Sequence, residues 1–342
     1  MIGNQLRNKK ILYLSARTFN LEKQIKFKLE SLGAFVTFYD ERIKDSTLSK
    51  AVIRINKNIF KSKILRYYKS ILNQTQHQEF DFMLVIRGEV VPEFFLKKFK
   101  EQHPQCVLIF YNWDSFTNTP NTSNFIHLYD RAFTFDPDDA RNFNLHFRPL
   151  YYIDEYKNIK QNKEAFYDLL FLGTAHSDRY IISNKIKEEL AKHGRSMFCY
   201  YFMHNRWVYY FKKIFDKTFK YFDLKKISFK SLSVEEILDL YTNSKVILDI
   251  NHPNQKGLTL RTFESIGAQR KLITTNKEIL KFDFYNPDNI YVLDRENCKI
   301  DIGFLDLPYQ NINEISYNKL SIEGWIYNLF IDAESQYWSK FI

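Results

Sequence analysis

The chain has 342 residues, of which 45% are apolar and 17% aromatic, enough to build the cores of two domains of about 150 residues each. Its net charge of +10 favours anionic partners, such as nucleotide diphosphates, nucleic acid or an acidic membrane surface, without choosing among them. Cys106, Cys199 and Cys298 are scattered, which argues against a disulfide framework or a structural zinc site. No stretch approaches the ~20 apolar residues that span a bilayer. We expect a cytoplasmic protein, and a peripheral position on the inner face of the cell membrane stays open.

The N-terminal half alternates short apolar runs, typical of buried strands, with amphipathic segments, typical of helices. Asn20 is placed to cap the first helix and Gly33 to end it. The basic, amphipathic residues 50–78 predict one or two further helices. This alternation indicates a Rossmann-like α/β domain, which we assign to residues 1–150. Its strands are predicted at residues 10–15, 35–39, 82–86, 107–111 and 132–135.

The alternation restarts after a polar segment, residues 151–166, which is the predicted linker. A second Rossmann-like domain is assigned to residues 167–315 and a C-terminal helical segment to residues 316–342, where Ser321 can cap a helix. The sequence Ser233-Val-Glu-Glu236 predicts a capping box at the start of another helix. The strands of this half are predicted at residues 168–172, 196–201, 246–250, 272–274 and 290–293.

The segment from Gly257 to Thr275, GLTLRTFESIGAQRKLITT, carries the clearest chemical signal. It follows a predicted strand and a polar loop, and it predicts a short helix and a second strand, which together make a βαβ unit. Free N–H groups and the positive end of a helix dipole make such a unit suitable for a diphosphate. Arg261 and Glu264 share one helical face, so one can meet phosphate while the other accepts hydrogen bonds from hydroxyls. The alternative is an exposed surface ion pair.

Together with this segment, FLGTAHSDR (residues 171–179) and YNWDS (residues 111–115) resemble segments of GT-B glycosyltransferases. The sequence is most similar to the CgeB-like group, which carries a "glycosyl transferases group 1" C-terminal domain. The resemblance implies an α/β fold of two Rossmann-like domains facing a cleft, with the C-terminal helix packed back on the N-terminal domain. It also implies a nucleotide-sugar donor held by the C-terminal domain and an acceptor held by the N-terminal domain.

The resemblance assigns roles to residues of the second half. Glu264 falls where a glutamate holds the ribose hydroxyls. Many retaining members carry another glutamate eight residues earlier, but this chain has Lys256, which could instead neutralise the leaving diphosphate. The stereochemistry of transfer is therefore open. The further donor-site residues are Gly257, Thr259 and Arg261 in the phosphate loop, Gly173 and Arg179 in the earlier glycine loop, and His252 beside them.

Asp114 is the candidate general base, because an inverting transfer needs a carboxylate or histidine beside the acceptor hydroxyl. It follows a predicted strand, and the neighbouring Trp113 can stack on a sugar ring. The alternative role for Asp114 is to cap the next turn. Arg87 and Glu89, after the adjacent strand, are further catalytic candidates. Residues 136–138 spell Asp-Pro-Asp, but their place before a helical pattern favours N-capping over metal binding.

Residues 208–226, VYYFKKIFDKTFKYFDLKK, predict a basic amphipathic helix. Phe211, Ile214 or Phe215, Phe219 and Phe222 fall on one face, flanked by lysines. Two interpretations stay open. The helix can lie on an anionic membrane surface, or it can pack on its own domain with a solvated basic side.

From these features we expect a glycosyltransferase of hexosyl or related type. It would move a sugar from a nucleotide-diphosphate donor to a glycan or lipid-linked acceptor in bacterial surface polysaccharide or lipopolysaccharide synthesis. No metal and no cofactor beyond the nucleotide-sugar co-substrate is expected, and no nucleic-acid partner. Two alternatives remain: a basic nucleic-acid-binding protein, and a catalytically silent GT-B-like scaffold.

Overall fold

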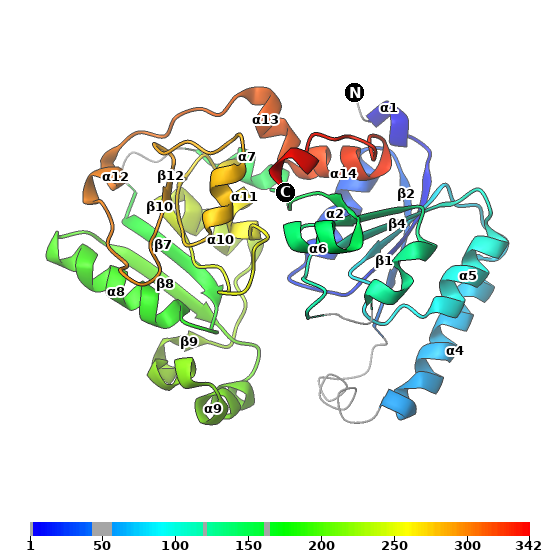
Figure 1. The fold of residues 1–342 in the computed structure, drawn as a ribbon, viewed down its shortest axis with the longest axis horizontal. Coiled ribbons are helices and arrows are strands. Elements are labelled where there is room, and N and C mark those ends of the chain that lie inside the picture. The colour runs from blue at the N-terminus through cyan, green and yellow to red at the C-terminus, as the bar shows by residue number, and fades with distance from the viewer. Residues whose placement is uncertain (1–2, 43–56, 119–121, 161–164) are drawn as a thin grey trace. The chain divides into compact units, whose positions relative to one another are not determined.

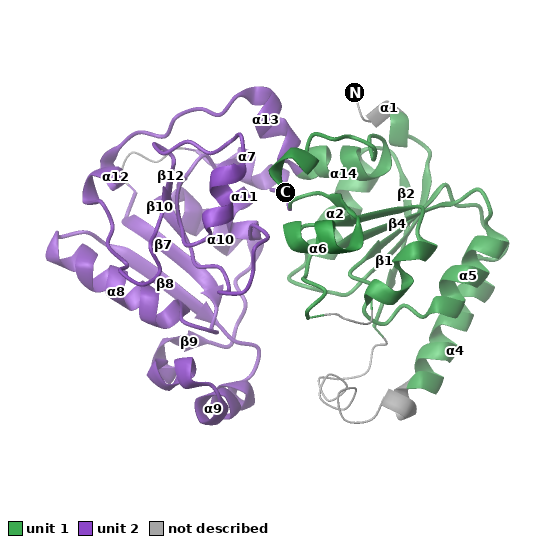
Figure 2. Ribbon diagram, in the orientation of Figure 1, with its two compact units in different colours: residues 1–149, 322–342 green, residues 150–321 purple. Residues whose placement is uncertain are grey.

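The computed structural model describes residues 3–42, 57–118, 122–160 and 165–342. The chain divides into two compact units (Figures 1 and 2). Unit 1 contains residues 1–149 and 322–342, and unit 2 contains residues 150–321. Each unit has its own parallel sheet with helices around it, as expected for two Rossmann-like domains. The predicted fold class is confirmed.

The sheet of unit 1 has the order β2-β1-β3-β4-β5-β6, and all its strand pairs are parallel. The five predicted strands are present, with small differences at their ends. The sixth, β6, has two residues and is too short to leave a pattern in the sequence. The strands are β1 (Lys10–Ser15), β2 (Phe35–Asp40), β3 (Phe82–Ile86), β4 (Val107–Asn112), β5 (Arg131–Thr134) and β6 (His146–Phe147).

The predicted start of the first long helix of unit 1 needs a correction. Asn20 adopts a left-handed conformation, with φ of 62°, and its side chain makes no capping hydrogen bond. Instead, the carboxylate of Glu22 accepts a hydrogen bond from the N–H of Thr18 at 3.1 Å. Gly33, with φ of +88°, follows the end of this helix as predicted. The helices are α1 (Gly3–Leu6), α2 (Leu21–Ser31), α4 (Lys57–Thr75), α5 (Glu93–Gln102), η1 (Thr122–Leu128), α6 (Pro137–Phe143), α14 (Ile322–Phe330) and η5 (Ser339–Phe341).

Residues 57–75 of the predicted helical segment 50–78 form α4, and residues 50–56 lie outside the described residues. The C-terminal helix α14 belongs to unit 1 although it is distant from it in sequence (Figure 2). The ring of Trp325 meets Tyr111 edge to face at 4.8 Å. Arg131 donates to the carbonyls of Leu329 and Phe330 at 3.1 and 2.6 Å. These contacts confirm that the C-terminal helix packs on the N-terminal domain.

The sheet of unit 2 has the order β12-β11-β10-β7-β8-β9, again with parallel pairs. The chain builds β7, β8 and β9 in one direction and then returns to place β10, β11 and β12 on the other side of β7. The point where this direction reverses lies between β7 and β10. The strands are β7 (Tyr167–Thr174), β8 (Met197–Phe202), β9 (Ile227–Ser228), β10 (Ser244–Asp249), β11 (Lys271–Thr274) and β12 (Ile290–Val292).

Unit 2 includes part of the segment that the sequence suggested as a linker. The N–H of Tyr152 donates to the carbonyl of Leu320 at 3.0 Å, and residues 154–157 form a helical turn. The predicted capping box of Ser233 and Glu236 is present. The helices are α7 (Asp154–Lys157), α8 (Arg179–Lys192), α9 (Arg206–Phe215), η2 (Lys217–Tyr221), η3 (Leu224–Lys226), α10 (Val234–Thr242), α11 (Leu260–Gly267), η4 (Lys277–Lys281), α12 (Ile302–Asp306) and α13 (Glu314–Lys319).

Candidate functional site

The predicted donor-site residues of unit 2 gather at the carboxyl ends of β7 and β10. These strands are neighbours, so the loops that follow them meet. The guanidinium of Arg179 donates from Nε to the carbonyl of Ile250 at 2.8 Å, and the rings of His176 and His252 lie 5.7 Å apart. This is the point where the strand order reverses, and open α/β sheets bind ligands in the crevice outside such a point.

Gly173 and Arg179 act as one feature of this edge. A Cβ on Gly173 would lie 2.8 Å from Cζ of Phe171 and 3.3 Å from Nη1 of Arg179, so glycine leaves room for the Phe171 ring and, less critically, for the guanidinium. Nη1 of Arg179 donates to the carbonyl and hydroxyl oxygens of Thr174 at 3.2 and 3.0 Å. Nη2 has no hydrogen-bond partner among the described residues. Arg179 therefore links the ends of β7 and β10 and keeps its Nη2 amino group available as a donor.

The loop after β10 is held by polar contacts that the sequence did not suggest. The side-chain amide of Asn251 donates to the carbonyl of Gln255 at 2.9 Å, and that of Asn276 donates to the carbonyl of Lys256 at 3.0 Å. Arg295 fixes the start of the loop: Nη2 donates to the Asn251 carbonyl at 2.7 Å, while Nη1 pairs with Asp178 at 2.7 Å. The loop geometry is therefore preorganised by its own Asn251 and by side chains from two other segments.

The helix α11 begins directly after this loop. Its N-cap residue, Thr259, makes no side-chain capping hydrogen bond, so the helix start is not closed by its own cap. Asp249, the last residue of β10, is buried and accepts from the hydroxyls of Thr262 and Thr274, both at 3.3 Å. Burial raises the pKa of Asp249, and the nearby Arg179 opposes that rise.

Arg261 and Glu264 form the predicted (i, i+3) pair, with Nη1 and Oε2 2.6 Å apart. The pair is largely buried rather than exposed, because only 18% and 16% of the two side chains are accessible. Tyr241 completes it: its hydroxyl accepts from Arg261 at 3.0 Å and donates to Glu264 at 3.2 Å. Burial by itself lowers the pKa of Arg261, but Glu264 and Tyr241 outweigh this effect and raise it above its usual value. Nε of Arg261 is buried and unpaired among the described residues.

The remaining donor candidates differ in exposure. His252 and Lys256 are exposed on the loop, whereas Gly257 is buried. Burial, aided by Arg179 and Lys212, lowers the pKa of His176 to about 2, so its ring is neutral at physiological pH. Burial and the same two cations also lower the pKa of His252. The edge thus combines several fixed cations with neutral imidazoles, which suits an anionic ligand.

The three catalytic candidates of unit 1 also come together, at the carboxyl ends of β3 and β4. Nη2 of Arg87 lies 3.4 Å from Oδ2 of Asp114 and 3.4 Å from Oε2 of Glu89. Arg42 pairs with the same oxygen of Glu89 at 2.9 Å. Arg87 has φ of 69°, which is unusual for a residue other than glycine. Backbone strain of this kind is enriched at functional sites.

Asp114 also fills the turn-capping role that the sequence left as an alternative. Oδ1 of Asp114 accepts from the N–H of Ser115 at 3.0 Å and from Nδ2 of Asn118 at 2.9 Å. Its second oxygen faces Arg87, and Trp113 beside it is half-buried. To act as a base, Asp114 must exchange one of these partners for an acceptor hydroxyl.

Glu41, two residues before the undescribed segment 43–56, is a group that the sequence did not single out. It is fully buried after β2, and neither carboxylate oxygen has a hydrogen-bond partner among the described residues. Burial raises its pKa to about 8; Arg42 and Arg87 oppose the rise, while Glu89 and Asp40 add to it. No local pattern marks Glu41, because its burial depends on how distant segments pack.

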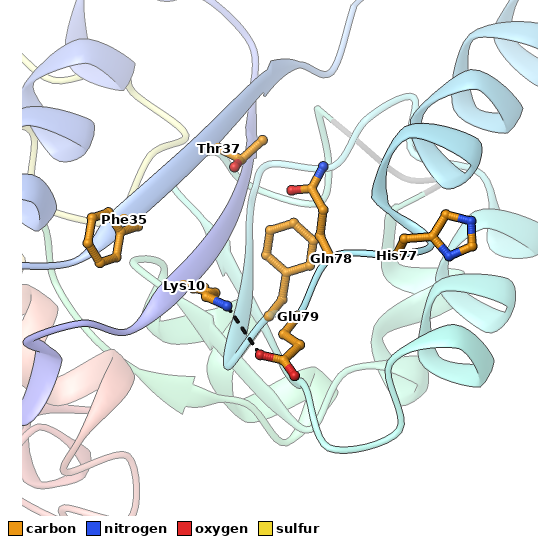
Figure 3. Close-up of a pocket in the computed structure, with 7 residues that line it drawn as sticks. Lys10, Phe35, Thr37, His77, Gln78 and Glu79 are labelled. Atoms are coloured by element: carbon orange, nitrogen blue, oxygen red, sulfur yellow. Dashed lines mark hydrogen bonds and ion pairs between the residues drawn. The ribbon is translucent and has the colours of Figure 1, made fainter.

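Two other features of unit 1 lie apart from these candidates. Asp136 caps α6, as predicted, by accepting from the N–H groups of Asp138 and Asp139. A pocket of about 470 Å³ opens at the amino ends of β1 and β2, where Lys10 pairs with Glu79 at 3.1 Å (Figure 3). None of the predicted site residues lines this pocket. Its lining is Lys10, Phe35, Thr37, His77, Gln78, Glu79 and Phe80.

Comparison with known proteins identifies the architecture. No protein-family model matches the sequence, and a search of curated proteins found no match. Solved structures do match over nearly the whole chain. An α-glucosyltransferase in complex with UDP and a 13-mer DNA has a TM-score of 0.58 at 13% identity, covering 95% of this chain and 98% of that one.

Two further structures give similar values. The N-terminal domain of trehalose-6-phosphate phosphatase from Candida albicans has a TM-score of 0.59 at 10% identity, covering 96% of this chain and 97% of that one. A glycosyltransferase from Rickettsia africae has a TM-score of 0.56 at 12% identity, covering 98% of each chain. At these identities the likeness shows the fold. The chain has the GT-B architecture of two Rossmann-like domains.

Proposed function

We propose that this protein is a glycosyltransferase that takes a sugar from a nucleotide-diphosphate donor bound at the carboxyl edge of the unit 2 sheet. One observation carries the proposal: Arg179, bonded to the carbonyl of Ile250, and Arg261, in the first turn of α11, flank the loop that leads to the uncapped start of α11 at the point where the strand order reverses. Guanidinium groups and free helix N–H groups are suited to a diphosphate. Two structural neighbours were solved with UDP, which makes UDP the first nucleotide to test.

Within this proposal, Arg179, Lys256 and the first turn of α11 neutralise the diphosphate as it leaves, without a metal ion. Glu264, already bonded to Tyr241, is placed to accept hydrogen bonds from ribose hydroxyls. In unit 1, Asp114 accepts the proton of the acceptor hydroxyl, while Arg87 and Glu89 position it. The sugar is a hexose or a related residue, and the acceptor is a glycan or glycolipid of bacterial surface polysaccharide or lipopolysaccharide synthesis.

A thermal-shift titration with UDP and UDP-glucose tests the donor assignment, because a ligand that binds the folded state raises its melting temperature. We expect a concentration-dependent rise for the wild type. Lys256→Gln should weaken UDP binding several-fold, since Lys256 is exposed on the loop and its loss leaves the core intact. Lys187→Gln, an equal charge change on the exposed side of α8, is the matched control and should bind like the wild type.

Equal UDP affinity in the Lys256→Gln and Lys187→Gln variants would remove Lys256 from the donor site. The absence of any shift with nucleoside diphosphates or their sugar conjugates would remove the donor site itself and favour a silent scaffold.

Binding to nucleic acid is the second candidate, favoured by the net charge of +10 and by the DNA in one neighbouring complex. It predicts oligonucleotide binding that weakens steeply with salt and does not depend on UDP-glucose. The glycan acceptor is preferred, because the two groups of site residues fit donor and hydroxyl chemistry and the described residues carry no recognised nucleic-acid-binding motif.

A further inference from the structure

The helix α9 of unit 2 turns its apolar side toward solvent. Trp207, Phe211, Ile214 and Phe215 follow one another at spacings of four, three and one, so they share one helical face. Their exposed fractions are 80%, 63%, 76% and 70%. Tyr209 is the buried residue of the helix, and its hydroxyl donates to the carbonyl of Phe222 at 3.1 Å. A helix of a soluble domain normally directs its apolar face inward.

The sequence pattern predicted one continuous stripe, and the structure corrects it. The helix ends at Phe215, and Asp216 caps the next short helix, η2, by accepting from the N–H of Thr218. Phe219 and Phe222 then join Tyr209 in the core of unit 2, while Trp207, Phe211, Ile214 and Phe215 remain outside. The segment thus packs on its own domain through Tyr209, Phe219 and Phe222, and it leaves the opposite side of α9 exposed. Figure 1 shows α9 at one end of unit 2, next to β9.

The surroundings of this apolar face are strongly basic. Residues 206–230 contain eight lysines and arginines but only two aspartates. Both aspartates are used in caps: Asp216 by Thr218 and Asp223 by the N–H of Lys225 at 2.9 Å. The exposed basic residues are Arg206, Lys213, Lys217, Lys220, Lys225, Lys226 and Lys230.

We propose that the α9 surface, formed by Trp207, Phe211, Ile214, Phe215 and the lysines around them, docks onto an anionic phospholipid bilayer. Exposed aromatic and aliphatic side chains beside lysines match the acyl–headgroup boundary of such a bilayer. A symmetric pairing of two copies through this face would oppose its lysines to one another. Stacking on nucleic-acid bases would leave Ile214 without a suitable partner.

This surface adjoins the candidate donor site. β8 leads from the carboxyl edge of the sheet into α9, and the Lys212 ammonium is close enough to His176 and His252 to act on both electrostatically. Docking would bring that edge close to the bilayer, where a lipid-linked acceptor is presented. The bilayer contact is inferred from the α9 surface alone. A role for this contact in acceptor choice rests on the proposed function. No helix of the described residues is long and apolar enough to cross a membrane.

Cosedimentation of the full chain with vesicles tests the proposal. We expect binding to phosphatidylcholine vesicles containing phosphatidylglycerol, and at least tenfold weaker binding to phosphatidylcholine alone. The triple variant Phe211→Ser, Ile214→Ser, Phe215→Ser should lose binding at least tenfold. Its matched control changes Phe166, Leu280 and Ile315, also exposed in unit 2, to serine and should bind like the wild type.

A charge variant measures the electrostatic contribution to vesicle binding. Changing Lys217, Lys220 and Lys225 to glutamine should weaken partitioning into anionic vesicles roughly 100-fold. The same change at the exposed lysines 187, 277 and 299 should have a much smaller effect. Each variant should keep the melting temperature and the UDP response of the wild type, which shows that the fold and donor site are intact.

Equal binding to neutral and anionic vesicles, or full binding by the apolar triple variant, would overturn the proposal. So would failure of the wild type to bind anionic vesicles while it dimerises or binds an oligonucleotide through residues 206–230. A wild type that binds vesicles but shows no nucleotide response would instead support the docking surface and contradict the proposed function.

Discussion

The carboxyl edges of the two sheets carry different sets of charged groups on closely related topologies. In unit 1, the guanidiniums of Arg87 and Arg42 lie among the carboxylates of Glu89 and Asp114, with the buried Glu41 near them. In unit 2, the guanidiniums of Arg179 and Arg261 act electrostatically on the buried carboxylate of Asp249. The same edge of a parallel sheet is thus adapted to two chemistries. Carboxylates handle hydroxyl protons, and guanidiniums neutralise phosphate.

The two edges also differ in how firmly they are built. The loop after β10 is fixed by Asn251, Asn276 and Arg295 through hydrogen bonds of 2.7–3.0 Å. The edge of unit 1 contains buried polar atoms without partners among the described residues, in Glu41, Arg87 and Asn112. Such groups cost free energy unless something satisfies them. The donor edge retains such atoms as well, Oγ1 of Thr259 and Nε of Arg261, so the edges differ in the hydrogen bonds that hold the loop after β10.

Asp114→Asn should have the largest effect on activity if unit 1 supplies the base. Loss of a general base reduces turnover by roughly 10²–10⁴-fold. UDP affinity should be unchanged, because Asp114 belongs to the other unit. Steady-state transfer kinetics and a UDP titration of the same preparation measure the two quantities. Turnover within a few-fold of the wild type would exclude Asp114 as the base and weaken the contrast between the edges.

Arg261→Ala should destabilise the fold as well as the donor site. It leaves Glu264 largely buried without its cation, which costs roughly 3–5 kcal/mol of unfolding free energy. Urea denaturation measures this loss. The double variant Arg261→Met, Glu264→Leu removes both charges and should recover most of the stability but not the UDP affinity. If the double variant binds UDP normally, this ion pair is structural only.

Glu41→Gln should change how stability depends on pH. The pKa of Glu41 is raised to about 8 in the fold, from an ordinary value of 4.5. Between these values the folded state keeps a proton that the unfolded state releases, so this group's contribution to stability is complete below pH 4.5 and is lost as pH rises through about 8. The slope approaches about 1.4 kcal/mol per pH unit. Arg42, Arg87, Glu89 and Asp40 face Glu41 and modulate it.

Urea denaturation at pH 5, 6, 7 and 8 gives the free energy of unfolding of the wild type and of Glu41→Gln. The difference between the two proteins at each pH isolates the contribution of Glu41. We expect the advantage of the wild type to shrink across this range. A pH-independent difference would mean that Glu41 is ionised throughout, and that the edge of unit 1 holds a charged carboxylate at its centre.

Much of the fold was predictable from the sequence, because buried strands and helix caps are local signals. The apolar run before the Gly257 loop gave β10, and Ser233 with Glu236 gave the capping box of α10. Asn20 shows where local signals fail. Asparagine is a common N-cap residue, but the backbone of Asn20 is left-handed and its side chain makes no capping hydrogen bond; the Glu22 carboxylate accepts from the N–H of Thr18 instead. Local chemistry restricts the choices, and tertiary contacts select among them.

Site residues that directly follow predicted strands could be identified from the sequence. Site residues that contact these loops from remote parts of the sequence could not. Arg179, Arg261 and Glu264 could be proposed because glycines and strand ends mark their loops. Arg295 and Tyr241 could not, since each reaches the site across at least 20 residues. The exposure of α9 was also undetermined, because periodicity defines an apolar face without showing which way it points.

Hydrogen–deuterium exchange with and without UDP-glucose shows most directly whether the donor binds at the edge of unit 2 and not at the edge of unit 1. We expect the donor to slow exchange in residues 173–179 and 251–264 of unit 2. Peptides covering residues 84–89 and 110–115 of unit 1 should change much less with the nucleotide alone. Protection confined to the unit 1 peptides, or no protection in either set at saturating UDP-glucose, would contradict the assignment of the donor to the guanidinium-rich edge.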